Sequence, residues 1–411
     1  MTKKSDAPAI RFKGFSDAWE QRKLGELGTI TTGSTPSTSI PDYYSDDGIV
    51  WVTPTDICEN ITFESARKLS DLGQQVGRVV PKNTILVTCI ASIGKNTMLG
   101  NTGSFNQQIN GLTPNENECD PYFLLTESAL WSAKMKSSAA AGTMQIVNRT
   151  EFSELKTWLP SLIEQQAISD FFRQLDNLIT LHQRKFEKLT NVKKSMLEKM
   201  FPQNGSSYPE IRFKGFTDPW EQRKLGELVD RVVRKNTNNE STLPLTISAQ
   251  YGLVDQITYF NNRVASRDVS NYYLVLNGEF AYNKSTSDGY PFGAVKRLDL
   301  YEKGVLSTLY IVFAPKKEQQ IDSDYLTVFF DTDRWHKGVA ERAAEGARNH
   351  GLLNISAEDF FDIDLSVPKD IVEQKQIGAF IRQLDNLITL HQRELEKLQN
   401  IKKSMLEKMF V

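Results

Sequence analysis

Long apolar runs are missing from this 411-residue sequence, so nothing in it predicts a membrane span. The first residues, Met1 to Asp6, lack the apolar core of a signal peptide. Cysteine is scarce, and Cys58, Cys89 and Cys119 are an odd number without metal-ligand spacing. This cysteine usage argues against a disulfide framework and for a reducing compartment. We therefore expect a cytoplasmic protein that does not contact a membrane.

Catalytic motifs are missing as well. The sequence has no N-P-P-F or D-P-P-Y run of the kind that adenine and cytosine methyltransferases need. Its four histidines are scattered and predict neither a metal site nor a Ser/His/Asp arrangement. Residues 94–96 (GKN) lack most of a phosphate-binding loop. Residues 373–375 (EQK) imitate part of a nuclease motif, but the first repeat has EQQ there, and Glu373 is better explained as a helix cap.

The chain also has no excess of positive charge. It contains 49 Lys and Arg residues and 51 Asp and Glu residues, which give a net charge of −2. Nucleic-acid-binding proteins usually have a basic balance. Any such surface must therefore come from local clustering of polar and basic side chains. With 39% hydrophobic residues, the chain is long enough to form two or more domains with real cores.

The strongest feature that is present is an internal repeat. Residues 10–27, IRFKGFSDAWEQRKLGEL, recur as residues 211–228 with two substitutions. Residues 164–201 recur as residues 373–410, and the runs RQLDNLITLHQR and KKSMLEKMF inside them are identical. The sequence therefore predicts two near-identical frames.

The frames hold different inserts, since residues 28–163 and 229–372 show little resemblance to each other. Repeat solenoids differ from this pattern, because their stacked units must all resemble one another. Both inserts have short strand-like runs, such as 84–88 and 309–313, between short helical stretches such as 122–135 and 324–335. We expect an α+β fold with two mixed α/β domains, a pseudo-two-fold repeat that presents two recognition surfaces at a fixed geometry.

Each repeat ends in a long predicted helix. Ser161 with Glu164, and Asp370 with Glu373, have the spacing of a capping box, and Pro202 ends the first helix. Apolar residues then recur at alternating steps of four and three, the pattern of a coiled-coil seam. The seam residues are Ile168, Phe172, Leu175, Ile179, His182, Phe186 and Leu189 in the first helix, and Ile377, Ile381, Leu384, Ile388, His391, Leu395 and Leu398 in the second.

A second stripe that includes Leu178 and Leu387 repeats in sevens on the same helices. A two-stranded pair needs only one seam, so this stripe packs either on the chain's own domains or on partner subunits. His182 and His391 fall near the middle of the helices, where a polar residue that fixes the register explains them better than a metal or catalytic role. The predicted segments are a domain at 10–160, a helix at 161–201, a linker at 202–210, a domain at 211–369 and a helix at 370–410.

If the two recognition surfaces bind DNA, the polar loops of the inserts are the candidate contacts. Ordinary turns and solvated surface account for the same polar residues equally well. In the first insert, hydroxyls, a lysine suited to phosphate and amides suited to adenine stand out: Thr32, Ser34, Thr35, Lys95, Asn106, Gln107 and Gln108. In the second insert the candidates are Asn283, Lys284, Lys296, Arg297, Arg348, Asn349 and His350. The last three lie between glycines, which permit a close approach to a groove.

Over nearly its whole length the chain resembles the specificity subunits of type I restriction-modification systems. The most specific matches are the duplicated WEQRKLGEL starts at 19–27 and 220–228, and the duplicated helices with EQ-x-x-I followed by RQLDN. Other segments also resemble parts of the family's recognition domains: residues 35–37 with Trp51, 106–108 and 346–351.

This resemblance implies two target recognition domains that each read one half of a bipartite, asymmetric site in double-stranded DNA, held on an antiparallel coiled coil. It also implies two methyltransferase subunits docked on the helices and two ATP-driven motor-endonuclease subunits. S-adenosylmethionine and ATP with Mg²⁺ then belong to those partners, while this chain binds no cofactor and catalyses no reaction. A coiled-coil adaptor that presents two protein-binding domains is the main alternative, and a nuclease is a weaker one.

Overall fold

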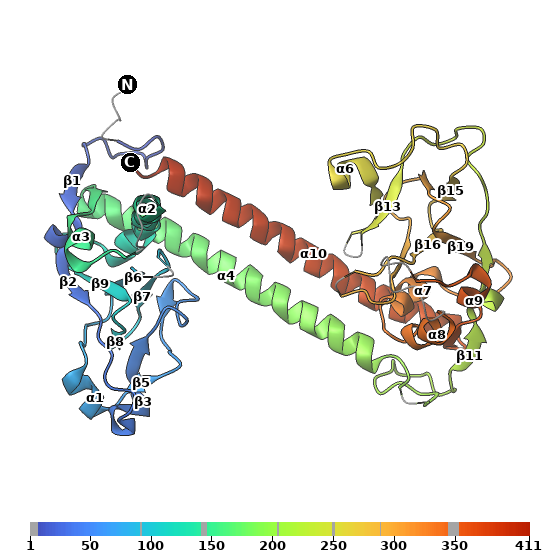
Figure 1. Ribbon diagram of the computed structural model, residues 1–411, viewed down its shortest axis with the longest axis horizontal. Helices are drawn as coiled ribbons and strands as arrows, with labels where there is room; N and C mark the ends of the chain where they lie inside the picture. Colours follow the sequence, from blue (N-terminus) through green and yellow to red (C-terminus); the bar gives the residue numbers. More distant parts are fainter. Residues whose placement is uncertain are drawn as a thin grey trace. The chain divides into compact units, whose positions relative to one another are not determined.

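The computed structural model divides the chain into two compact units: unit 1 comprises Met1–Gln183 with Arg393–Val411, and unit 2 comprises Arg184–Gln392. Figure 1 draws the chain. The structure describes residues 7–90, 93–140, 146–203, 205–248, 251–287, 289–343 and 353–411. We call the globular part of unit 1 the first domain and that of unit 2 the second domain. No helix in these described ranges is both long and apolar enough to cross a membrane.

The first domain is built on a five-stranded sheet with the order β2-β9-β6-β7-β4, a smaller sheet β5-β3-β8 and the pair β1-β10. Helix α2 packs against β6 and β7. Its elements are β1 (Glu20–Lys23), η1 (Leu24–Glu26), β2 (Gly28–Thr32), η2 (Pro41–Tyr43), β3 (Tyr44–Val52), β4 (Ile61–Thr62), β5 (Lys68–Leu69), α1 (Asp71–Val76), β6 (Ile85–Thr88), β7 (Asn96–Leu99), β8 (Gly103–Phe105), β9 (Ile109–Pro114), α2 (Pro121–Ala140), α3 (Arg149–Glu154) and β10 (Lys156–Leu159).

The second domain has a four-stranded sheet with the order β12-β19-β16-β17, and the pairs β13-β14, β15-β18 and β11-β20. Helix α7 packs against β17. Its elements are β11 (Glu221–Lys224), α5 (Leu225–Leu228), β12 (Val229–Arg231), β13 (Leu245–Ser248), β14 (Gly252–Asp255), α6 (Gln256–Phe260), β15 (Tyr273–Leu276), β16 (Phe280–Asn283), β17 (Ala294–Arg297), β18 (Lys303–Leu306), β19 (Ile311–Pro315), α7 (Ser323–Phe330), α8 (His336–Arg342), α9 (Ala357–Phe361) and β20 (Asp364–Val367).

The two inserts share one sheet topology although their sequences are unlike. The strands β2-β9-β6-β7 of the first domain correspond in order to β12-β19-β16-β17 of the second. The register agrees too, since Gly28 lies opposite Pro114 as Val229 lies opposite Pro315. This confirms the predicted mixed α/β fold of both domains.

The two long helices are α4 (Leu162–Lys199) and α10 (Ile371–Lys408). Within unit 1 the start of α4 packs against the end of α10, where Lys402 forms an ion pair of 2.6 Å with Asp176. Within unit 2 the end of α4 packs against the start of α10, where Lys193 forms an ion pair of 2.7 Å with Asp385. A shift of 209 residues converts one pair into the other, and in both units the helices run antiparallel.

The ends of the long helices belong to domain cores. In unit 1 the ring of Phe410 lies 6.2 Å from that of Trp19, and in unit 2 the ring of Phe201 lies 5.7 Å from that of Trp220. The backbone N–H of Ile10 donates to the carbonyl of Lys408, and that of Ile211 to the carbonyl of Lys199, both at 2.9 Å. The identical KMF ends of the helices therefore close equivalent parts of the two domains. The repeat thus extends to tertiary contacts.

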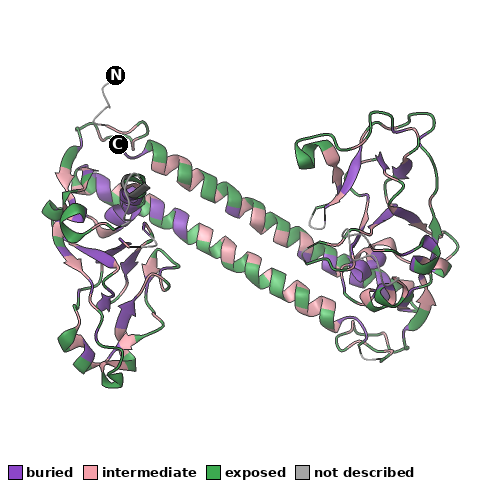
Figure 2. Ribbon diagram, in the orientation of Figure 1, coloured by how far each residue is buried: buried purple, intermediate pink, exposed green. Residues whose placement is uncertain are grey.

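Buried polar contacts tie the first turn of each long helix to its domain. The guanidinium of Arg11 donates two hydrogen bonds to the carboxylate of Glu164, and that of Arg212 does the same to Glu373. Both carboxylates are 1% exposed. Figure 2 colours the chain by burial and shows buried residues in the first turns of α4. These glutamates act as ion-pair partners and not as the capping-box residues that their spacing predicts. Asp370 is a cap, because its Oδ1 accepts the N–H of Val372 at 2.8 Å.

Candidate nucleic-acid interface

The hydroxyl-rich loop after β2 lies against the turn before β9. The hydroxyl of Thr32 donates to Oδ1 of Asn110 at 2.7 Å, and the backbone N–H of Ser34 donates to the carbonyl of Phe105 at 2.9 Å. The hydroxyl of Thr35 contacts the amide oxygen of Gln107. The indole of Trp51 donates to the carbonyl of Ser34 at 3.0 Å and holds the loop. Two runs that are far apart in sequence therefore form one surface.

The amide side chains of Asn106, Gln107 and Gln108 on this surface differ in burial and in hydrogen bonding. Asn106 is 8% exposed, and its Oδ1 accepts the backbone N–H of Gln108 at 3.1 Å, so it shapes the turn. Its amide nitrogen also donates to Oε1 of Gln108 at 3.0 Å. Gln107 is exposed at the centre of the turn, beside the exposed Thr35. Gln107 and Thr35 are therefore the groups in this run best placed to meet a ligand.

Lys95 lies at the same edge of the sheet. The carbonyl of Gln108 accepts the N–H of Cys89 at 2.8 Å, and the carbonyl of Lys95 accepts the N–H of the adjacent Thr88 at 3.0 Å. The Lys95 side chain is exposed, and its Nζ donates to the carbonyl of Pro54 at 3.1 Å. A cation therefore accompanies the hydroxyl and amide groups of the first domain.

In the second domain, Asn283 is the last residue of β16 and Lys284 follows it. Oδ1 of Asn283 accepts the N–H of Ser285 at 3.0 Å. Nζ of Lys284 donates to the carbonyl of Ile355 at 3.3 Å. Both side chains are half-buried. Arg348, Asn349 and His350 lie outside the described residues.

Lys296 and Arg297 are engaged in ion pairs inside the second domain. Nζ of Lys296 lies 2.7 Å from Oδ1 of Asp331, and Arg297 pairs with Asp299 and Asp324 at 2.6 and 2.8 Å. Although burial raises the pKa of Asp331, the ammonium groups of Lys296 and Lys193 outweigh it and hold that pKa below its usual value. With side chains 19% and 11% exposed, Lys296 and Arg297 have an evident structural role.

The coiled-coil candidates separate into two groups. Most seam positions are buried or half-buried: Phe172, Leu175, Ile179, His182, Phe186, Leu189, Ile381, Leu384, Ile388, His391, Leu395 and Leu398. Leu178 and Leu387, from the second stripe, are 45% and 43% exposed. Other members of that stripe pack on the chain's own domains, since Phe171 contacts Phe12 and Phe380 contacts Phe213.

Two more leucines are exposed beside these positions. Leu181 in unit 1 is 46% exposed, and its repeat equivalent Leu390 in unit 2 is 52% exposed. We call Leu178 with Leu181, and Leu387 with Leu390, the two leucine patches. The i, i+3 spacing within an identical segment was the available signal for Leu181 and Leu390, which the seam pattern alone does not include.

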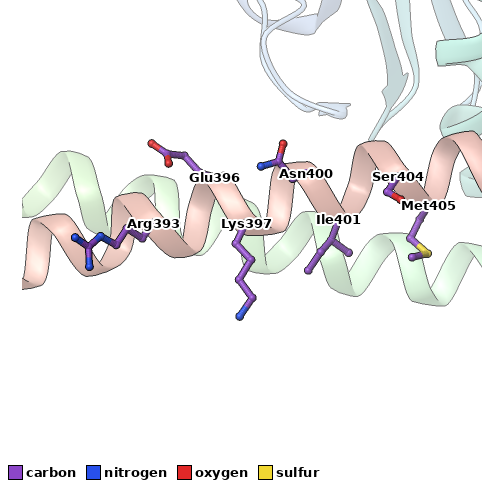
Figure 3. A pocket seen from close by; sticks show the side chains of 7 residues that line it. All are labelled: Arg393, Glu396, Lys397, Asn400, Ile401, Ser404 and Met405. Carbon is purple, nitrogen blue, oxygen red and sulfur yellow. The ribbon is translucent and has the colours of Figure 1, made fainter. Parts of the chain in front are cut away.

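A shallow groove follows each long helix. In unit 1 it lies along the last turns of α10, where Figure 3 shows its polar and apolar side chains: Arg393, Glu396, Lys397, Asn400, Ile401, Ser404 and Met405. In unit 2 an equivalent groove lies on α4: Arg184, Glu187, Lys188, Asn191, Val192, Ser195 and Met196. A shift of 209 residues relates the two sets, and only the valine and isoleucine differ.

Glu127, on α2, is a buried acidic group that the sequence did not single out. It is 3% exposed, and its Oε1 accepts the backbone N–H of Trp158 at 3.3 Å, while its Oε2 is buried without a hydrogen bond. Burial raises the pKa of Glu127 to about 7. Glu127 belongs to no potential metal site, since the described part of the chain contains no cluster of three or more His, Cys, Asp or Glu side chains able to hold an ion.

Comparison with known proteins gives a consistent match. The model of the type I restriction modification DNA specificity domain matches residues 16–191 and 217–400. The type I restriction enzyme MjaIX specificity subunit of Methanocaldococcus jannaschii is 26% identical over 229 residues, which are 51% of this chain and 51% of that protein. The HindI specificity subunit of Haemophilus influenzae is 28% identical over 192 residues, 44% of this chain and 40% of that protein.

A solved structure also resembles the chain. The type I restriction-modification system S subunit from M. genitalium aligns with a TM-score of 0.65 at 15% identity, over 98% of this chain and 99% of that one, which supports the fold. The matched segments span about half of the length of the two curated relatives. Because the family model covers both repeats, this chain belongs to the type I restriction-modification DNA specificity family.

Proposed function

We propose that each globular domain reads one half of a bipartite site in double-stranded DNA, and that the paired helices set the spacer between the halves. The observation that carries this proposal is the combination of one frame and one sheet topology with two unlike loop surfaces. A shared scaffold keeps the geometry constant, while different loops provide different base preferences. Each 38-residue helix spans about 57 Å, long enough to separate half-sites one helical turn apart.

In the first domain, Thr35 and Gln107 are the groups that we assign to base edges. A glutamine amide can both donate to and accept from adenine in the major groove. Lys95 is the group that we assign to a phosphate, which positions the domain without reading sequence. Because the net charge of the chain is −2, partner subunits supply much of the remaining phosphate contact.

The two leucine patches are the docking sites that we assign to methyltransferase subunits. Leu178 with Leu181 and Leu387 with Leu390 are exposed in identical sequence surroundings. Two equivalent patches suit two copies of one partner, each of which meets the same residues. The two motor-endonuclease subunits complete the complex. In this arrangement the methyltransferase holds S-adenosylmethionine, the motor subunits use ATP with Mg²⁺, and this chain contributes neither a cofactor site nor a catalytic group.

Plasmid methylation tests the proposal. The methyltransferase subunits should methylate adenines in one bipartite sequence when this chain is present and leave the same plasmid unmodified when it is omitted. The double variant Leu178→Asp with Leu181→Asp should weaken docking at one patch. The control variant Leu300→Asp, which changes an exposed leucine of the second domain outside both patches, should have no effect. Unmodified plasmid in the presence of all subunits would instead favour the adaptor function.

A further inference from the structure

The turn before the second strand of the sheet order, β9 in the first domain and β19 in the second, has the same construction in both domains. In the first domain it follows Phe105, the last residue of β8, and the N–H of Ile109 donates to the carbonyl of Asn106 at 3.2 Å. In the second domain it follows Leu306, the last residue of β18, and the N–H of Tyr310 donates to the carbonyl of Ser307 at 3.2 Å. The backbone therefore closes in the same way.

The side chain at the first position of the turn also makes the same hydrogen bond in both domains. Oδ1 of Asn106 accepts the N–H of Gln108 at 3.1 Å, and Oγ of Ser307 accepts the N–H of Leu309 at 3.3 Å. Asn and Ser are two of the residues that stabilise turns by bonding the backbone two residues on. The first position is thus structural in both domains, and the next two positions differ in chemistry.

The second and third positions of the turn differ between the domains. In the first domain they are Gln107 and Gln108, and in the second they are Thr308 and Leu309. Gln107 and Thr308 are both exposed, and Leu309 is 66% exposed. One turn therefore presents amide groups in one domain, and a hydroxyl with a branched apolar side chain in the other.

The surroundings of the second turn suit DNA as well. Pairing of β16 with β19 ends where Tyr282 lies opposite Ile311. Asn283 is the last residue of β16 and Lys284 follows it, so both lie at the end of the sheet where the turn with Thr308 and Leu309 leads into β19. In the first domain the corresponding end of β6 contacts the turn through the carbonyl of Gln108. A cation and an amide thus accompany the turn in the second domain, as Lys95 does in the first.

We propose that this turn is the base-reading element of both domains, and that Thr308 and Leu309 recognise thymine methyl groups in the half-site of the second domain. The inference rests on the proposed DNA-reading function. The thymine C5-methyl group projects into the major groove and is the one apolar feature there, so an apolar side chain selects it. The exposed Gln107 amide instead suits the N6 and N7 edge of adenine.

Base analogues give a direct test. The bipartite site is first mapped from methylated adenines, and the chain in complex with its methyltransferase subunits is then titrated with synthetic duplexes that carry the mapped site. Each thymine in the second domain's half-site is replaced singly by deoxyuridine, which lacks only the methyl group. Loss of one buried methyl contact should weaken wild-type binding about fourfold at the contacted position.

Three variants test which residues read the thymine methyl group. Leu309→Ala should weaken binding to the thymine duplex by a similar factor and should no longer distinguish thymine from deoxyuridine. Leu300→Ala, which removes a leucine 62% exposed elsewhere on the same domain, should behave like the wild type. Exchanging Gln107 and Gln108 with Thr308 and Leu309 keeps both structural first positions, and it should move the deoxyuridine sensitivity to the half-site of the first domain.

The outcomes separate this inference from the proposed function. If wild-type complex binds the mapped site specifically but tolerates deoxyuridine at every position, or if the half-site contains no thymine in either strand, the turn assignment is overturned while the DNA-reading function stands. A deoxyuridine effect that persists unchanged at every thymine position in Leu309→Ala also overturns it. If the complex shows no preference for the mapped site over unrelated DNA, the proposed function itself fails.

Discussion

Replacement of Phe410 by alanine tests how the end of α10 is used. The Phe410 ring is 6% exposed and lies 6.2, 5.5 and 5.8 Å from the rings of Trp19, Phe123 and Phe172. It therefore belongs to the core of the first domain, although Trp19 is at the opposite end of the sequence. Phe410→Ala removes this ring and leaves a cavity between the three aromatic residues.

The expected loss of folding stability in Phe410→Ala follows from the packing of this ring. Phe-to-Ala changes in protein cores cost about 3–5 kcal/mol. For a unit of this size, each kcal/mol lowers the melting temperature by about 2–4 °C, so the first domain should melt roughly 6–20 °C earlier. Phe201→Ala is the matched variant, because Phe201 is 1% exposed and packs on Trp220, Tyr325 and Phe329 in the second domain.

Hydrogen exchange of the full chain, followed peptide by peptide, is the assay. Phe410→Ala should speed exchange of β6 and β9 in the first domain and leave β16 and β19 protected, whereas Phe201→Ala should do the reverse. The reasoning is refuted if Phe410→Ala leaves β6 and β9 as protected as in the wild type. Equal loss of protection in both domains would also refute it, because the contacts of Phe410 would then not be specific to the first domain.

Three further predictions address the frame, the buried carboxyl group and the helices. Arg11→Met should destabilise the first domain by about 3–5 kcal/mol, because it leaves the buried carboxylate of Glu164 unpaired, and the double variant Arg11→Met with Glu164→Met should regain most of that loss in chemical denaturation. A double variant as unstable as the single one would contradict the pairing. Burial raises the pKa of Glu127 to about 7, so the folded domain keeps a proton that the unfolded chain releases near 4.5. Stability is therefore greatest at low pH within this window and falls by about 1.4 kcal/mol per unit as pH rises from 4.5 to 7, and Glu127→Gln should flatten that slope in melting curves. An unchanged slope would mean that another group titrates. Insertion of one heptad into both α4 and α10 at equivalent positions adds about 10 Å and should lengthen the DNA spacer by roughly three base pairs with both half-sites unchanged, as methylation mapping would reveal. A change in the half-site bases would contradict the proposed role of the helices.

The local patterns in the sequence were sufficient for the helices and several strands. Steps of four and three predict α4 and α10, and the strand-like runs at 84–88 and 309–313 overlap β6 and β19. These features depend on residues that are close in sequence. The common sheet topology of the inserts depends on pairing between distant strands, such as β2 with β9, and unlike sequences give no signal for it.

Tertiary contacts explain the differences between prediction and structure. The helical pattern at 324–335 predicts a longer helix than α7, which ends at Phe330. The next residue, Asp331, is half-buried and forms ion pairs with Lys193 and Lys296, and Lys193 comes from α4. The sequence of Lys296 and Arg297 suggests a basic surface. It does not reveal that both side chains form ion pairs with carboxylates inside the domain.

Exchange of one insert is the most direct test of the central claim that each domain reads its own half-site. Residues 28–155, which are the first insert up to β10, are replaced by the corresponding residues of another family member. Methylated adenines are then mapped across the genome of cells that express the hybrid with its partner subunits. The account predicts that one half-site changes, while the other half-site and the spacer stay as they were. A change in both halves, or an unchanged site at equal protein level, would contradict it.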